Sequence, residues 1–208
     1  MPHMTLSLLA VRAKPGARSR GVLLAGRLAI PVVLGRAGIR ANKREGDGAT
    51  PRGLFRLRRL WWRPDRGRKP LTLLPAIRID PAVAWCEDAG DRRYNRPFRR
   101  SANEPGDRLW RDDDLYDLIV EIDHNARPRI AGRGSAVFLH VARPDRSPTA
   151  GCIALAARDL RRLLARLGPD TRIFVDAQQG MKKLNEPRGI PSRRNCRQTL
   201  WRGRTAAP

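Results

Sequence analysis

The stretch FLHVARPDRSPTAGCIAL, residues 138–155, joins an apolar strand pattern to a loop that ends in a Gly-Cys pair. Its first part belongs to SAVFLHV, residues 135–141, whose β-branched and aromatic residues predict a core strand. A loop with two prolines follows, and Cys152 then comes twelve residues after His140. If the loop turns back, the imidazole of His140 can meet the sulfur of Cys152, because twelve extended residues would otherwise span roughly 40 Å.

Outward from this stretch, short apolar blocks predict a mainly β fold. LYDLIVEI, residues 115–122, has the same strand character as residues 135–141. Residues 5–36 contain apolar blocks separated by glycines, a spacing typical of strands and hairpins. Residues 171–177, TRIFVDA, predict a final strand. We therefore expect the chain to open as a β-meander and to remain mainly β.

One segment has helical periodicity. Residues 157–168, ARDLRRLLARLG, follow the reactive cysteine, and they place four leucines on one face: Leu160, Leu163, Leu164 and Leu167. Gly168 and Pro169 are typical of a helix end. The pattern predicts one helix after Cys152.

Residues 63–114 have the weakest periodicity in the chain. A long irregular insertion in a compact domain is usually a functional lid or binding loop, so we expect this segment to cover a groove. Tyr94 and Asn95, in DRRYNRPF, are candidates for contact with a substrate from that lid.

The charge is strongly positive, with 43 Lys and Arg residues against 20 Asp and Glu residues and a formal net charge of +23. Five of the cations are lysines, which leaves 38 arginines, spread along the whole chain. One interpretation is an anionic polymer as partner; the other is a coding bias toward arginine. Because the arginines form no block with interleaved aromatic residues, the charge names no partner, and we do not expect nucleic acid to be one.

The three cysteines, Cys86, Cys152 and Cys196, form no CxxC pair and have no spacing typical of zinc ligands. We therefore expect neither a disulfide framework nor a metal site. The apolar run at residues 6–11 is short for a signal peptide, and no stretch approaches the ~18 apolar residues of a membrane helix. The sequence thus predicts no transmembrane segment and has no recognisable export signal.

Cys152 and His140 have the chemistry of a nucleophile and its general base. An imidazole and nearby helix N-terminal N–H groups can lower the pKa of a cysteine from about 8.5 to between roughly 3.5 and 7.5. Gly151 allows close approach of a substrate, so the N–H groups of Gly151 and Cys152 are candidates for an oxyanion hole. The alternative is structural: free cysteines are often buried, and His140 would then be a core histidine.

A resemblance to a known family favours the catalytic interpretation. FLHVARPDRSPTAGCIAL, with GDGATPRGLFRL far upstream, resembles the catalytic domain of bacterial L,D-transpeptidases. In that family a His precedes a [Ser/Thr]-His-Gly-Cys motif, and a TP-x-G-x-F stretch lies N-terminal to both. The resemblance covers about residues 5–177 and implies a β-sandwich or cradle with one helix after the cysteine and a lid-like insertion.

Residue by residue, the resemblance implies that Cys152 is the acylated nucleophile and His140 the general base. Thr149 and Gly151 match the Ser/Thr and the Gly of the motif. The upstream motif is matched by Thr50, Pro51 and Gly53. No cofactor is implied.

Two positions depart from the family pattern. Ala150 replaces the His of the motif, and Ala154 stands where an Arg or Asn is often found. Both replacements remove side chains that could anchor a substrate. Arg143 or Arg146 can supply this contact instead, because a guanidinium binds a carboxylate through two hydrogen bonds.

The function implied is cross-linking of peptidoglycan stem peptides through a thioester on Cys152, with release of terminal D-Ala, or L,D-carboxypeptidase activity when water is the acceptor. It further implies a location in the cell envelope and acylation by carbapenems. The alternative, from another class, is a non-enzymatic binder of an anionic polymer in which Cys152 is inert. We expect residues 1–177 to form the catalytic domain and residues 178–208, with eight cations and one acid, to form a flexible basic tail.

Overall fold

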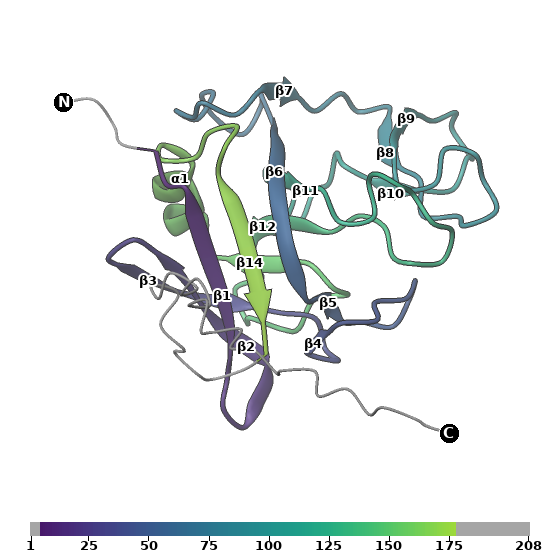
Figure 1. Ribbon diagram of the computed structural model, residues 1–208. Coiled ribbons are helices and arrows are strands. Elements are labelled where there is room, and N and C mark those ends of the chain that lie inside the picture. The colour runs from purple at the N-terminus through teal and green to yellow at the C-terminus, as the bar shows by residue number, and fades with distance from the viewer. Residues whose placement is uncertain (1–4, 178–208) are drawn as a thin grey trace, which may run out of the picture.

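The computed structural model describes residues 5–177 and is mainly β, as the sequence predicts (Figure 1). A large sheet contains β1 (Leu8–Lys14), β2 (Ala17–Ala25), β3 (Leu28–Val33), β6 (Gly53–Trp62), β7 (Ala76–Arg78), β11 (Leu118–Ile122), β12 (Phe138–Val141), β13 (Ile153–Leu155) and β14 (Arg172–Asp176). The predicted tail and Cys196 lie outside the described residues. Within residues 5–177, no helix has the length and apolar character needed to cross a membrane.

The large sheet curves until it closes on itself. Its strand order is β11-β12-β13-β3-β2-β1-β14-β6-β7, and β11 also pairs with β6. Strand β11 therefore has a neighbour on each side. All five of its residues are buried, and both of its faces are packed: Leu118, Val120 and Ile122 belong to the main core, whereas Ile119 belongs to a second apolar cluster. The near-continuous apolar run of residues 118–122 is the sequence signature of such a strand.

The main core lies inside this curved sheet. It combines side chains from most of the strands with the leucine face of α1 (Ala157–Leu164). Leu160, Leu163, Leu164 and Leu167 are all fully buried, as their spacing predicts. The helix itself ends at Leu164, before the glycine and proline that were expected to end it.

The insertion at residues 63–114 contains more regular structure than its sequence predicts. After β7, it forms a small three-stranded sheet of β8 (Val83–Trp85), β9 (Pro97–Arg99) and β10 (Asp107–Arg108). Trp85 and Leu109 of this segment belong to a second apolar cluster together with Phe138 and Cys152. The insertion and Cys152 therefore share one apolar cluster. Strands of two or three residues are too short to show a period in the sequence.

A short strand separates Cys152 from the helix. Strand β13 pairs in parallel with β12, so that Ala154 lies opposite His140. The sequence-based expectation that helix N-terminal N–H groups surround Cys152 is therefore wrong, because the chain first runs along β12 and only then enters α1 at Ala157. This pairing brings the cysteine segment back beside the strand that carries His140.

Candidate active site

Cys152 follows a turn that the side chain of Thr149 closes. The Thr149 hydroxyl donates to the carbonyl oxygen of Cys152 at 2.7 Å and accepts from the N–H of Gly151 at 3.2 Å. Backbone bonds also join Thr149 to Leu34 and Arg36, beside the end of β3. The Ser/Thr position of the motif therefore shapes the loop that presents the sulfur.

Only glycine fits at position 151. Its φ of +151° lies in a region that L side chains rarely adopt, and a Cβ would lie 2.8 Å from the carbonyl oxygen of Ala49. Ala49 precedes β5 (Thr50–Pro51), which pairs with β4 (Ile39–Arg40), so the upstream TP motif lies against the cysteine turn. The two motifs, far apart in sequence, meet at this backbone contact.

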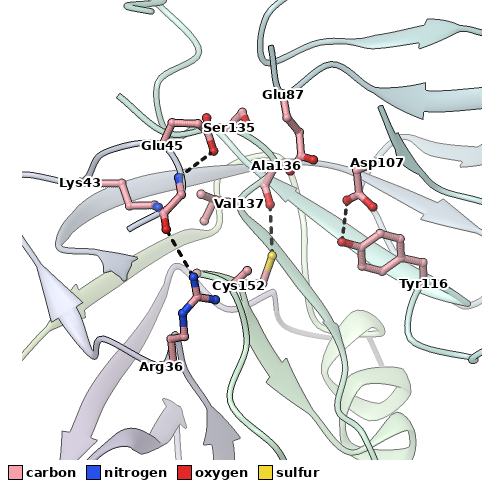
Figure 2. A pocket seen from close by; sticks show the side chains of 13 residues that line it. Arg36, Lys43, Glu45, Glu87, Asp107, Tyr116, Ser135, Ala136, Val137 and Cys152 are labelled. Atoms are coloured by element: carbon pink, nitrogen blue, oxygen red, sulfur yellow. Dashed lines mark hydrogen bonds between the residues drawn. The ribbon is translucent and has the colours of Figure 1, made fainter. Parts of the chain in front are cut away.

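The sulfur of Cys152 is held as a thiol. Its Sγ donates to the carbonyl oxygen of Ala136 at 3.1 Å, and the residue is 8% exposed (Figure 2). Burial, together with the charges of Asp107 and Glu87, raises the pKa of Cys152 to about 12. At neutral pH the resting sulfur therefore carries its proton.

His140 is a neutral imidazole with one nitrogen already committed. Its Nδ1 lies 2.8 Å from the carbonyl oxygen of Val141, and since a carbonyl can only accept, Nδ1 carries the hydrogen and Nε2 has the free lone pair. Burial lowers the pKa of His140 to about 4. The ring of Tyr116 packs against it edge to face at 5.4 Å. A neutral imidazole is the form that a general base requires.

Two cavities meet at Cys152. The smaller, of about 190 Å³, contains both His140 and Cys152 in its lining. The larger, of about 500 Å³, reaches Cys152 from the side of the insertion. Cys152, Tyr116 and Ala150 line both cavities. The structure therefore brings the predicted nucleophile and base to one cavity and makes the sulfur the junction with a second.

The two cavities differ in charge. The smaller cavity contains the guanidinium groups of Arg111 and Arg143. The larger one contains three carboxyl groups, from Glu45, Glu87 and Asp107. Burial, together with the charges of Asp107 and Glu45, raises the pKa of Glu87 to about 7. Burial also raises the pKa of Asp107, which accepts a hydrogen bond from Tyr116 at 2.8 Å.

Lys43 is a cation of the larger cavity that sequence reasoning missed. Its side chain is 5% exposed, and its Nζ donates to Asp47 at 2.6 Å and to the carbonyl oxygen of Arg44 at 2.9 Å. In the sequence, Lys43 stands just before the GDGATPRG stretch, and the sequence analysis did not select it. The available signal was its residue type, because lysine is rare in this arginine-rich chain.

Tyr94 and Asn95 lie behind the site and line neither cavity. Both are buried. The Asn95 side chain accepts from Trp85 and from the N–H of Ala136, and it donates to two backbone carbonyls of residues 124–125. The Tyr94 hydroxyl donates to Glu45 and accepts from the N–H of Gly134. Together they hold the segment whose Ala136 carbonyl binds the thiol; their contact with a substrate stays a prediction.

The two arginines expected to anchor a substrate are separated. Arg143 lines the small cavity with His140 and Cys152, whereas Arg146 lines a different one beside Arg20. Ala154, which lacks the side chain often found at its position, lines both of these cavities. Arg111, which the sequence analysis did not select, reaches the small cavity from the insertion and is paired with Asp113.

The family of the chain follows from a comparison with family models. A family model described as the L,D-transpeptidase catalytic domain (YkuD) matches residues 20–175, which include both motifs and the insertion. The chain belongs to the L,D-transpeptidase catalytic domain family. As a YkuD-type catalytic domain, it is grouped with cysteine acyltransferases and peptidases, and the family implies peptidoglycan as substrate and the cell envelope as the usual location. A search of the curated proteins found no match to this L,D-transpeptidase-type chain.

Proposed function

We propose that this L,D-transpeptidase family member cross-links peptidoglycan stem peptides through a thioester on Cys152. The observation that carries the proposal is the shared lining of the small cavity by Cys152 and His140, in a chain whose family uses a cysteine nucleophile. The proposal extends to the roles of the individual residues, to the acceptor and to the order of the steps.

In the first half-reaction, Nε2 of His140 takes the thiol proton as Sγ of Cys152 attacks the carbonyl carbon at the L-centre of the third-position diamino acid. The S–C bond forms, the C–N bond to the terminal D-Ala breaks, and the proton passes from His140 to the departing amine. Because both groups are neutral at rest, proton transfer accompanies attack and does not precede it.

Arg143 is proposed to bind the carboxylate of the departing D-Ala. It lines the cavity that holds both reacting residues, and a guanidinium can bind a carboxylate through two hydrogen bonds. Arg146, in another cavity, is proposed as a more distant contact for the same stem. Thr149 supports the cavity wall through the hydrogen bonds of its hydroxyl. Tyr94 and Asn95, behind this wall, complete the set of residues proposed to bind the substrate.

In the second half-reaction, the side-chain amine of another stem attacks the thioester, which forms a 3-3 cross-link and returns the proton to sulfur. The carboxyl groups of Glu45, Glu87 and Asp107 suit an ammonium group on its way to Cys152. Attack by water on the same thioester would release the acyl group as a tripeptide stem and return the thiol, which is L,D-carboxypeptidase activity. No cofactor takes part in either step as proposed.

We also propose the domain boundaries, the location and an inhibitor class of the protein. Residues 1–177 would form the catalytic domain and residues 178–208 a basic tail, and the protein would work in the cell envelope. A carbapenem, whose lactam carbonyl presents the same electrophile, would acylate Cys152.

Intact-mass analysis tests the function. The full chain is incubated with a tetrapeptide-bearing muropeptide, and the mass of the acyl-enzyme and of the products is followed. We expect a thioester adduct of the tripeptide on the wild type and none on Cys152→Ala. His140→Gln should lower the rate of adduct formation by about 100-fold or more. A wild-type protein that keeps its native fold but forms neither adduct nor product would refute the assignment.

A further inference from the structure

We infer that Lys43 is a further catalytic residue, whose ammonium group binds the oxyanion that forms when Cys152 attacks an acyl carbon. This inference rests on the proposed function, because it assigns a role in the same acyl transfer. The sequence analysis expected the N–H groups of Gly151 and Cys152 to bind this oxyanion.

The first argument is position. Lys43 lines the larger cavity with Gly151 and Cys152, and Figure 2 shows its side chain extending into the cavity from the wall that faces Glu87 and Asp107. An ideal Cβ built on Gly151 would lie 3.5 Å from Nζ. The ammonium group therefore lies beside the backbone immediately before Cys152, in the lining of the same cavity.

The second argument is the count of donors. An ammonium group has three N–H bonds. Nζ uses two of them, toward Asp47 and the carbonyl oxygen of Arg44. Among residues 5–177 no third group accepts from it. One N–H is therefore left for a ligand in a side chain that is otherwise buried.

The third argument is the state of the expected donor. The N–H of Gly151 donates to the Thr149 hydroxyl at 3.2 Å, so one of the two backbone groups expected in the oxyanion hole already has an acceptor. The charge of Lys43 also has an electrostatic use, since the carboxyl groups that line this cavity oppose a developing anion when they are ionised.

The support of Lys43 makes its position rigid. Asp47 binds Nζ and also accepts from the backbone N–H groups of Arg44 and Ala49. The carbonyl of Ala49 in turn packs on Gly151. Arg36, the other cation of this cavity, is joined to the cysteine turn through its backbone N–H, which donates to the carbonyl oxygen of Thr149, whereas its guanidinium donates to the carbonyl oxygen of Gly46.

In the reaction, the S–C bond forms while the π pair of the carbonyl moves onto its oxygen, which accepts a hydrogen bond from Nζ. Lys43 keeps its proton throughout. When the intermediate collapses, the pair on oxygen re-forms the C=O bond, the C–N bond breaks, and the amine leaves with the proton from His140.

The test compares two reactions of the same sulfur. Acylation by p-nitrophenyl acetate passes through an oxyanion, whereas alkylation by iodoacetamide does not. In Lys43→Gln we expect acylation of Cys152 to fall by about 100-fold relative to its alkylation. Lys43→Arg, which keeps a charged donor, should recover a large part of the loss, and Arg36→Gln should lose much less than Lys43→Gln.

Parallel loss of both reactions, or no loss of acylation, would overturn the inference. Lys43→Met serves in the same comparison if Lys43→Gln does not fold, because it keeps the length of the side chain. Because the ester needs no recognition of a stem peptide, the result is separate from the proposed function: absent muropeptide turnover with a selective ester defect would reject the substrate and retain the role of Lys43.

Discussion

The Sγ of Cys152 lies 3.1 Å from the carbonyl oxygen of Ala136, and this bond orients the resting thiol. A carbonyl oxygen can accept a hydrogen bond from a thiol but repels a thiolate. The contact and the burial of the sulfur therefore both favour the protonated thiol. The resting Cys152 is therefore a protonated thiol, and in the proposed reaction the neutral imidazole of His140 takes its proton.

The pH dependence of alkylation follows from this thiol. Since the pKa of Cys152 is raised to about 12, its thiolate fraction grows about tenfold with each pH unit across the neutral and mildly alkaline range. Iodoacetamide should therefore modify Cys152 slowly at pH 7 and progressively faster to pH 10. Peptide mapping separates it from the other cysteines. A rate that levels off near pH 7 would mean that the thiol ionises much more easily than the buried site implies.

His140 should make the free energy of unfolding depend on pH. Its folded-state pKa of about 4 lies below the ordinary value of 6.5, so the unfolded chain binds the proton more tightly. The stability that His140 contributes is present above about pH 6.5 and is lost as pH falls toward 4, by about 3 kcal/mol. Urea unfolding at pH 7 and pH 4 measures the loss. In His140→Gln the drop should be smaller by that amount; an equal drop in both proteins would contradict the assignment.

Arg143 and Arg146 should differ in their effect on a donor peptide. Arg143 shares a cavity with the reacting pair, and Arg146 does not. Arg143→Ala should raise the KM for a tetrapeptide donor by about tenfold, since a charge-assisted bond is lost, and Arg146→Ala should raise it less. Steady-state kinetics on the two variants give the comparison. Equal KM values in the wild type and both variants would remove the carboxylate-anchor role.

Gly151→Ala should disrupt the cysteine turn. The added Cβ would meet the carbonyl oxygen of Ala49 at 2.8 Å, at a φ that alanine rarely adopts. We expect a loss of about 1–3 kcal/mol in stability and of most acylation activity. Gly90→Ala, where the nearest atom is a carboxylate oxygen of Asp88 at 3.3 Å, is the matched control and should leave both quantities nearly unchanged. Normal acylation in Gly151→Ala would show that the turn can shift without cost.

Asn95→Ala should separate support of the site from contact with substrate. The change leaves the indole N–H of Trp85 and the N–H of Ala136 without their acceptor, which costs about 2 kcal/mol or more. Because the freed Ala136 segment positions the thiol, the alkylation rate of Cys152 should change in the absence of any substrate. A variant with unchanged alkylation but a raised KM would instead support direct contact of Asn95 with the peptide.

The helix face and the main strands follow from local patterns. Leu160, Leu163 and Leu164 are buried because a period of 3.6 residues places them on one face of the helix, and this face packs against the core. Residues 118–122 were recognisable because a strand that is buried on both faces needs a near-continuous apolar run. By contrast, β13 and the strands of the small sheet in the insertion are too short to show a period, and they form only when they pair with strands across intervening loops.

The sequence alone identifies Cys152, His140 and Gly151 as candidates, since a thiol, an imidazole and a flexible backbone are properties of the residue types themselves. Their protonation states are not. These depend on desolvation by Trp85 and Leu109 of the insertion and on the carbonyl of Ala136, which reach the sulfur only through tertiary packing. The same holds for Lys43, whose placement beside Gly151 arises because a loop more than a hundred residues earlier folds back against the cysteine turn.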